Sequence, residues 1–285
     1  MTNTNLRLFA ADMDGTLLDN DNAFNRRKFA GVIGILRRQQ KKFVIATGNQ
    51  TIRINKMFLP FDSDGQVISM VAENGAFVQN GQNLLHQSII DPIKTKRIYD
   101  LLPTLNPRPT LVVFAGKDAA FAPTWQESVQ VEGTRIFFAG TIDDFYPNWV
   151  PIKTFAEINV PIDKISLSWT NDSGQGFLDL LNSDPILSGL RSPISGFGAI
   201  DIVNKNADKA SGLQLLAKEL QIKPEEMAAF GDGLNDLEML QYVGHPYIMP
   251  NSQDELKSYF NQDQYTVSDN NHDGVLDTIL KLLDD

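Results

Sequence analysis

The sequence predicts an α/β protein with a doubly wound parallel-sheet core and an inserted α+β domain. Two observations support this prediction. At both ends of the chain, short apolar runs alternate with segments of helical periodicity, which is the pattern of parallel strands joined by right-handed helical crossovers. Between these ends, the apolar runs are interrupted by proline and alternate less regularly with helices. With 285 residues, the chain is long enough for both parts.

The N-terminal part of the core is predicted from three apolar runs that each end in a polar turn. We interpret these runs as buried strands over residues 6–11, 43–46 and 67–72. Apolar residues recur at helical spacing over 25–40, and a second helix is predicted over 50–58. The order strand, helix, strand, helix, strand is typical of a Rossmann-like sheet.

The pattern changes after the third strand. Residues 76–87, with Asn80-Gly81 in their middle, predict a hairpin. The following segment predicts three strands and two helices: strands over 111–115, 135–139 and 164–169, and helices over 93–102 and 175–181. We therefore assign residues 1–86 and 204–285 to the core and residues 87–203 to an inserted α+β domain.

The core pattern resumes after the insert. It predicts a helix over 209–220, a strand over 227–230, a strand over 245–249 and a closing helix over 275–283. Between these two strands lies a run rich in Gly and Asp, residues 231–236, which opens a further helix. The sheet is therefore predicted to be built from both ends of the chain.

Composition excludes several classes of function. There is no cysteine, so disulfides, thiolate zinc sites and a catalytic thiol are excluded. A net charge of −10 argues against nucleic acid as a partner. No apolar run approaches the roughly 18 residues of a membrane span, and residues 1–5 lack the features of a signal peptide. We expect a cytoplasmic protein without membrane contact, either a monomer or a weak homo-oligomer.

Two carboxylates stand two residues apart directly after the first predicted strand, in the run Asp12-Met13-Asp14-Gly15-Thr16. Ligand sites of parallel sheets lie at the carboxyl ends of their strands. Paired acids there can hold a divalent cation, and one acid can attack an electrophile while the other transfers a proton. Because the three histidines are scattered, hard oxygen ligands and Mg²⁺ are favoured. The pattern indicates phosphoryl transfer through an aspartyl phosphate.

Four ordered segments resemble the motifs of the haloacid dehalogenase (HAD) superfamily. They are Asp12-Met13-Asp14-Gly15-Thr16, Thr47-Gly48-Asn49, Lys209, and Gly231-Asp232-Gly233-Leu234-Asn235-Asp236. The layout is similar to Cof-type phosphatases, which carry a large C2 cap domain between the second and third motifs. Segments 46–50, 73–76, 195–198 and 269–274 resemble the sugar-phosphatase branch. The resemblance covers nearly the whole chain and implies that residues 87–203 form the cap.

The resemblance implies a role for each acidic residue. Asp12 would be the nucleophile, and Asp14 would protonate the leaving alkoxide and then deprotonate the attacking water. Asp232 would ligate Mg²⁺ together with the side chain of Asp12 and the backbone carbonyl of Asp14, and Asp236 would be a further ligand or a neighbour of the ligands. Asn235 would contact phosphate or orient the lysine of the third motif.

The remaining motif residues are expected to bind phosphate. Thr47 and Gly48 end a predicted strand before a helix, where a hydroxyl and free amides can bind phosphate oxygens. Lys209 would neutralise both the nucleophile and the phosphate, although Lys205 is a nearby competitor. Many relatives carry Arg where this chain has Asn49, so the roles of Asn49 and Gln50 stay open.

The function expected from these residues is a Mg²⁺-dependent phosphomonoesterase acting on small phosphorylated metabolites, with sugar phosphates favoured. A phosphotransferase or phosphomutase that uses the same intermediate is the nearest alternative. A catalytically silent binding protein that keeps the fold is a second alternative. A calcium loop is a third interpretation of Asp12 and Asp14, but Gly15 is fourth in that run, whereas an EF-hand loop needs glycine sixth.

Overall fold

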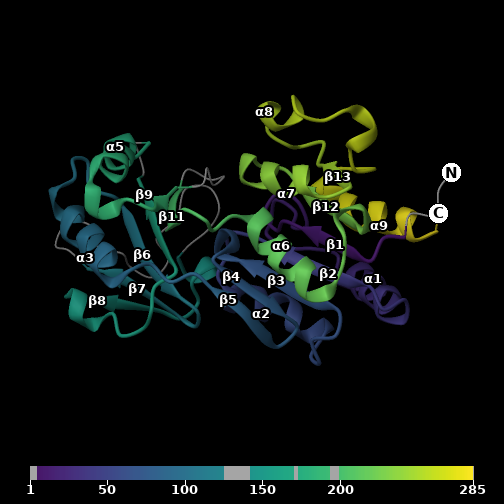
Figure 1. Cartoon of the computed structure of the whole chain (residues 1–285), viewed down its shortest axis with the longest axis horizontal. Helices are drawn as coiled ribbons and strands as arrows, with labels where there is room; N and C mark the ends of the chain where they lie inside the picture. The colour runs from purple at the N-terminus through teal and green to yellow at the C-terminus, as the bar shows by residue number, and fades with distance from the viewer. Residues whose placement is uncertain (1–4, 125–141, 170–172, 193–198, 285) are drawn as a thin grey trace. The chain divides into compact units, whose positions relative to one another are not determined.

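The computed structural model describes residues 5–124, 142–169, 173–192 and 199–284 (Figure 1). Internal contacts divide the chain into two compact units. The first, here called the core unit, comprises Met1–Gly48, Lys56–His86 and Asp208–Asp285. The second, the inserted unit, comprises Asn49–Asn55 and Gln87–Ala207. The short segment Asn49–Asn55 belongs to the inserted unit by its contacts, which the sequence pattern did not indicate.

The core unit is built on a seven-stranded sheet with the order β13-β12-β1-β2-β3-β4-β5. Strands β13 to β3 in this order pair in parallel, and β4 turns back antiparallel to β3. The strands are β1 Leu8–Ala11, β2 Lys42–Ala46, β3 Ile68–Ala72, β4 Phe77–Asn80, β5 Asn83–Gln87, β12 Met227–Gly231 and β13 His245–Ile248. The predicted parallel sheet, built from both ends of the chain and edged by a hairpin, is confirmed.

Helices cover both faces of this sheet. Helices α6 (Lys209–Leu220) and α7 (Leu237–Tyr242) contact each other and pack on one face. Helices α1 (Arg26–Arg38) and α9 (Gly274–Asp284) contact each other as a second pair. Side chains alternate along β2: Val44 packs with the α6 cluster, whereas the ring of Phe43 contacts Phe29 of α1. The two pairs of helices therefore enclose the sheet.

Local sequence explains why α1 forms where it was predicted. Asn25 caps its first turn by accepting a hydrogen bond from the backbone N–H of Lys28, and Arg37 and Arg38 end it. Its buried residues are the predicted apolar positions Phe29, Val32, Ile33 and Leu36. Helix α2 (Thr51–Phe58) begins in the segment that belongs to the inserted unit and ends in the core unit, and the short helix α8 (Asp254–Lys257) belongs to the core unit.

The inserted unit contains a six-stranded sheet with the order β10-β11-β9-β6-β7-β8, antiparallel except for the pair β7 and β8. Its strands are β6 Leu111–Gly116, β7 Ala119–Pro123, β8 Trp149–Ile152, β9 Lys164–Ser168, β10 Leu190–Arg191 and β11 Ala199–Asn204. Its helices are α3 Pro92–Leu101, α4 Ile142–Phe145 and α5 Gln175–Ser183. The predicted strand over 135–139 lies outside the described residues.

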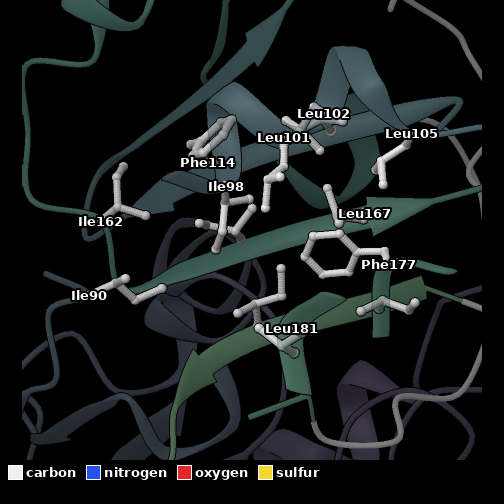
Figure 2. Close-up of a cluster of buried hydrophobic side chains, with 14 of the residues drawn as sticks. Ile90, Ile98, Leu101, Leu102, Leu105, Phe114, Ile162, Leu167, Phe177 and Leu181 are labelled. Atoms are coloured by element: carbon white, nitrogen blue, oxygen red, sulfur yellow. The ribbon is translucent and has the colours of Figure 1, made fainter. Parts of the chain in front are cut away.

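One apolar cluster joins the helices of the inserted unit to its sheet. Figure 2 shows Ile98 and Leu101 of α3, and Phe177 of α5, pointing toward Phe114 of β6 and Leu167 of β9. These side chains are at least nine-tenths buried. Burying each of them contributes roughly 1.5–3 kcal/mol. The inserted unit therefore has its own hydrophobic core and is α+β, as predicted.

A buried carboxylate in this unit gives its stability a pH dependence. Asp163 precedes β9 and is fully buried; its Oδ2 accepts a hydrogen bond from Nε2 of Gln87, while Oδ1 has no hydrogen-bond partner among the described residues. Burial raises the pKa of Asp163 to about 6, although the bond from Gln87 and the charge of Lys164 oppose this effect. Since an unfolded aspartate titrates near 3.8, the unfolded state releases this proton first as pH rises. The folded state is therefore penalised progressively between these two pKa values, and fully above pH 6.

We expect Asp163→Asn to remove this penalty. The variant should unfold at a higher urea concentration than wild type at pH 8, by up to about 3 kcal/mol, and show no such gain at pH 4. Fluorescence measures this unfolding, because all three tryptophans of the chain (125, 149 and 169) lie in the inserted unit. Asp184→Asn is the contrasting control, since Arg97 lowers the pKa of Asp184 and its loss should weaken the unit at pH 8. An equal effect of Asp163→Asn at both pH values would contradict the assignment.

Within the described residues, no helix combines the length and the apolar character that crossing a membrane requires.

Candidate active site

The candidate site lies at the carboxyl ends of three adjacent parallel strands. Asp12 follows β1, Thr47 follows β2 and Asp232 follows β12, and β1 lies between the other two strands in the sheet. Because parallel strands end at the same edge, the fold brings residues 12 and 232 together across the length of the chain. One carboxylate oxygen from each of Asp12, Asp232 and Asp236 lies within 4.8 Å of the others.

A buried lysine connects two of these carboxylates. Lys209 begins α6 and is 1% exposed, and its Nζ donates to Oδ1 of Asp12 at 2.7 Å and to Oδ1 of Asp236 at 2.6 Å. Asp12 is held in turn by its backbone N–H, which donates to the carbonyl of Phe230 in β12. The predicted choice of Lys209 over Lys205 agrees with this geometry, since Lys205 is exposed.

Asp236 is fully buried, and the described contacts use both of its oxygens. Oδ1 accepts from Lys209, while Oδ2 accepts from the backbone N–H groups of Asp232 and Gly233, each at 3.0 Å. This residue therefore fixes both the lysine and the turn that carries Asp232. The resemblance left two roles open for Asn235, contacting phosphate or orienting Lys209. Asn235 is half-buried, and the described hydrogen bonds of the Lys209 side chain go to the two aspartates, which leaves the phosphate contact as the proposal for Asn235.

The turn after β1 packs closely against Asp232. Thr16 is buried, and its Oγ1 donates to Oδ1 of Asp232 at 2.8 Å. Gly15 has φ +76°, and a Cβ at this position would lie 2.5 Å from Oδ2 of Asp232. Only glycine allows this combination of backbone angle and close approach. Asp14 is half-buried on the same turn, where it forms an isolated bridge with Leu18.

The charges of the site are unbalanced. Burial raises the pKa of Asp12 well above its usual range, and Asp236, Asp232 and Asp14 raise it further, against the lowering effect of Lys209. Burial, followed by the charge of Asp236, raises the pKa of Asp232 to about 7. Burial opposes the charged form of Lys209, but the two neighbouring carboxylates raise its pKa above the usual value. One cation is thus shared by several buried acids.

These residues fit a divalent metal ion. The ligand atoms that come together are carboxylate oxygens, which are the donors that Mg²⁺ and Ca²⁺ prefer. A bound cation would also relieve the repulsion that raises the pKa values of Asp12 and Asp232. Since both oxygens of Asp236 already accept hydrogen bonds, Asp12 and Asp232 are the better candidates for direct ligands.

Thr47 and Gly48 lie on the neighbouring strand end. The backbone N–H of Thr47 donates to the carbonyl of Val71, and its carbonyl accepts from the N–H of Asn74. Thr47 is buried, and a Cβ at Gly48 would lie 3.1 Å from the side-chain amide of Asn74. The turn after β3 therefore packs against Thr47 and Gly48, the segment that is predicted to bind phosphate.

That turn also positions Lys209, which the sequence did not reveal. Glu73, Asn74 and Gly75 all have positive φ, and a Cβ at Gly75 would lie 2.0 Å from the carbonyl oxygen of Asp208. Asp208 caps α6, directly before Lys209. The resemblance singled out segment 73–76 without a role; its glycine allows the start of α6 to approach. The signal in the sequence was the pair Asn74-Gly75, which tolerates left-handed backbone.

Residues 49–53 belong to the inserted unit, and several of their side chains contact other parts of it. The side chain of Asn49 accepts a hydrogen bond from the guanidinium of Arg53, which also lies over the ring of Phe145 at 4.4 Å. The Nε2 of Gln50 donates to the carbonyls of Gly116 and Ala119, at 2.7 and 2.9 Å. Position 49, where many relatives have arginine, is therefore occupied by an asparagine whose side chain accepts a hydrogen bond from Arg53. Segment 195–198, which resembles the sugar-phosphatase branch, lies outside the described residues.

A family model, two curated relatives and a solved structure are similar to this chain over nearly its whole length. A family model described as haloacid dehalogenase-like hydrolase matches residues 9–279. The chain is 27% identical to the 5-amino-6-(5-phospho-D-ribitylamino)uracil phosphatase YbjI of Escherichia coli K12, covering 98% of this chain and 96% of that protein. It is 27% identical to the phosphatase YwpJ of Bacillus subtilis, covering 98% and 100%. The crystal structure of SMU.1108c from Streptococcus mutans is similar in fold, with a TM-score of 0.84, 24% identity, and coverage of 98% and 100%.

Proposed function

The chain belongs to the haloacid dehalogenase-like hydrolase family, as a Cof-type phosphatase, and we propose that it is a Mg²⁺-dependent phosphomonoesterase that works through an aspartyl phosphate on Asp12. The observation that carries the proposal is the convergence of Asp12, Asp232 and Lys209 at one sheet edge. This arrangement supports the proposal, because the carboxylate proposed as nucleophile lies beside a buried lysine and a candidate metal site, and phosphoryl transfer requires these parts.

The proposed reaction has two halves. In the first, an oxygen of Asp12 attacks phosphorus, the bond from phosphorus to the ester oxygen breaks, and Asp14 gives its proton to the leaving alkoxide. In the second, Asp14 takes a proton from water, the water oxygen attacks phosphorus, and the bond to Asp12 breaks to release inorganic phosphate. Lys209 and the amides after Thr47 stabilise the phosphoryl oxygens throughout.

The metal would be held by the side chains of Asp12 and Asp232 and by the backbone carbonyl of Asp14. When bound, Mg²⁺ supplies positive charge to the transferred phosphoryl group. Asp236 serves this site by holding Lys209 and the turn of Asp232. Asn235 remains a proposed contact of the phosphate.

The proposed substrates are small phosphorylated metabolites, with sugar phosphates first. The E. coli relative is named for a substrate whose phosphate sits on a ribityl chain, which supports this class. We propose residues 87–203 as a cap that excludes bulk water and contacts the leaving group. We further propose that the protein works in the cytoplasm, as a monomer or weak homo-oligomer.

The experiment that tests this function measures inorganic phosphate released from a panel of phosphorylated metabolites. We expect release without any added acceptor, loss of release on chelation with EDTA, and recovery with Mg²⁺. Mg²⁺ alone should also raise the thermal unfolding temperature, because an ion that binds only the folded state stabilises it. Transfer of phosphate only when an acceptor is supplied would favour a phosphotransferase or mutase. No turnover despite Mg²⁺-dependent stabilisation would favour a silent binding protein.

A further inference from the structure

Two asparagines near the C-terminus hold the turn that carries Asp14. Asn251 lies shortly after β13, and Asn270 lies in a single 3₁₀ turn, Asn270–His272, that precedes α9. Both contact the turn after β1, which is more than 230 residues away in the chain. None of the roles assigned so far involves either residue.

Their contacts are made to backbone carbonyls of the turn. Nδ2 of Asn251 donates to the carbonyl of Gly15 at 2.7 Å, and Nδ2 of Asn270 donates to the carbonyl of Leu18 at 3.0 Å. The same amide group of Asn270 also donates to Oδ1 of Asn20 at 3.1 Å. The backbone N–H of Asn270 donates to Oδ1 of Asn251 at 3.3 Å, so the two asparagines are linked.

Both carbonyls follow Asp14 closely in the chain, and both belong to residues that are linked to it. Gly15 is bonded directly to Asp14, and its α-carbon packs against Asp232. Leu18 is the bridge partner of Asp14. Fixing the carbonyls of Gly15 and Leu18 therefore restricts how the backbone of Asp14 can rotate.

The segment that supplies Asn270 is itself anchored. Nζ of Lys28 in α1 lies 2.7 Å from Oδ2 of Asp273 and 2.8 Å from Oδ1 of Asp277, and the side chain of Asn25 donates to Oδ2 of Asp273. Asn270 is 5% exposed, and its Oδ1 is buried with no hydrogen-bond partner among the described residues. An unpaired buried acceptor destabilises a fold. The described side-chain hydrogen bonds of Asn270 are therefore those that its Nδ2 group donates to Leu18 and Asn20.

We propose that Asn251 and Asn270 are positioning residues that hold Asp14 in its working conformation; this inference rests on the proton-transfer role of Asp14 proposed above. The amides act through the backbone and need not touch the substrate. Displacing a catalytic group by about 1 Å can reduce a rate by roughly 100-fold. The inference therefore predicts an effect on kcat rather than on substrate binding.

The test uses isosteric Asn→Asp variants of the full chain. Asn270→Asp replaces the donating amide by a carboxylate that faces the carbonyl of Leu18 and Oδ1 of Asn20. We expect kcat to fall about 10- to 100-fold with KM within a factor of about three. Amide hydrogen exchange of residues 14–18, measured without substrate, should become faster, while exchange in the sheet strands stays as in wild type.

The neighbouring Asn271 provides the matched control. Its Oδ1 accepts a hydrogen bond from the backbone N–H of Asn20, and a carboxylate accepts equally well, so Asn271→Asp should behave as wild type. Asn251→Asp is a second variant at an exposed position, for the case in which Asn270→Asp does not fold. Because the two asparagines act on one turn, the double variant should lose less activity than the product of the two single losses.

Wild-type kcat and unchanged exchange of residues 14–18 in Asn251→Asp or Asn270→Asp would overturn the inference. A uniform rise in exchange over the whole core unit would also overturn it, since it would mean that these residues only stabilise the fold. If the wild-type protein released no phosphate from any ester, the proposed function would fail by itself. The exchange data would in that case still decide whether the asparagines hold the turn.

Discussion

Asp12→Asn is expected to abolish phosphate release while leaving the core unit folded. The amide has the shape of the carboxylate but cannot attack phosphorus, so we expect at least a roughly thousandfold loss of kcat. Folding should not suffer, because burial and three neighbouring acids disfavour the charge on Asp12. Lys209 keeps its second partner, Asp236, in this variant. The measurements are steady-state phosphate release and thermal unfolding.

The same variant tests the covalent intermediate. Rapid acid quenching of the wild-type enzyme with labelled substrate should trap label on the protein, and Asp12→Asn should trap none. Asp21→Asn is the matched control, because Asp21 is exposed nearby on the chain and has no proposed role. Retention of more than a tenth of wild-type activity in Asp12→Asn would rule out the nucleophile assignment.

The core unit could be predicted from the sequence because its signals are local. Each parallel strand is a short buried run, and each helix shows apolar residues at helical spacing, as in α1. Strand order then brings Asp12 and Asp232 together, since both follow strands that end at one edge. The contact between Lys209 and Asp12 was expected from the resemblance of the motifs. In the structure, Nζ of Lys209 lies 2.7 Å from Oδ1 of Asp12.

The inserted unit was less predictable because its strands carry weak patterns. Strand β10 has two residues, and β8 contains Pro151, which an edge strand tolerates. Long-range contacts were also missed. The pair Asn74-Gly75 indicates a turn, but it does not reveal that Asp208 approaches there. Nothing local identifies Asn251 and Asn270 as partners of the turn after β1. Such contacts depend on tertiary packing between segments that are distant in the chain.

Lys209→Met is expected to impair both activity and stability. Methionine nearly fills the space of the lysine, but Asp12 and Asp236 lose the cation that both of them contact. Removing one partner of a buried ion pair destabilises a protein by about 3–5 kcal/mol, because a buried charge is left uncompensated. Activity should fall at least about 100-fold, since a positioned charge at the phosphoryl group is lost.

The pH dependence of the activity of Lys209→Met shows whether the loss of activity comes from the effect of the lysine charge on Asp12. Lys209 lowers the pKa of Asp12, so its removal should raise that pKa further and leave more of the nucleophile protonated at neutral pH. The pH profile of the remaining activity should therefore be displaced toward alkaline pH relative to that of the wild-type protein. The folded variant would also bind more protons than its unfolded state, so its stability should fall, relative to wild type, as pH rises.

Lys205→Met is the matched control for this pair of measurements. Lys205 is exposed and lies in the turn before α6, shortly ahead of Lys209, so its substitution should change neither the pH profile nor the unfolding temperature. Equal behaviour of the two variants would mean that the charge of Lys209 does not act on Asp12. A loss of stability in Lys209→Met with a wild-type pH profile would limit the lysine to a structural role.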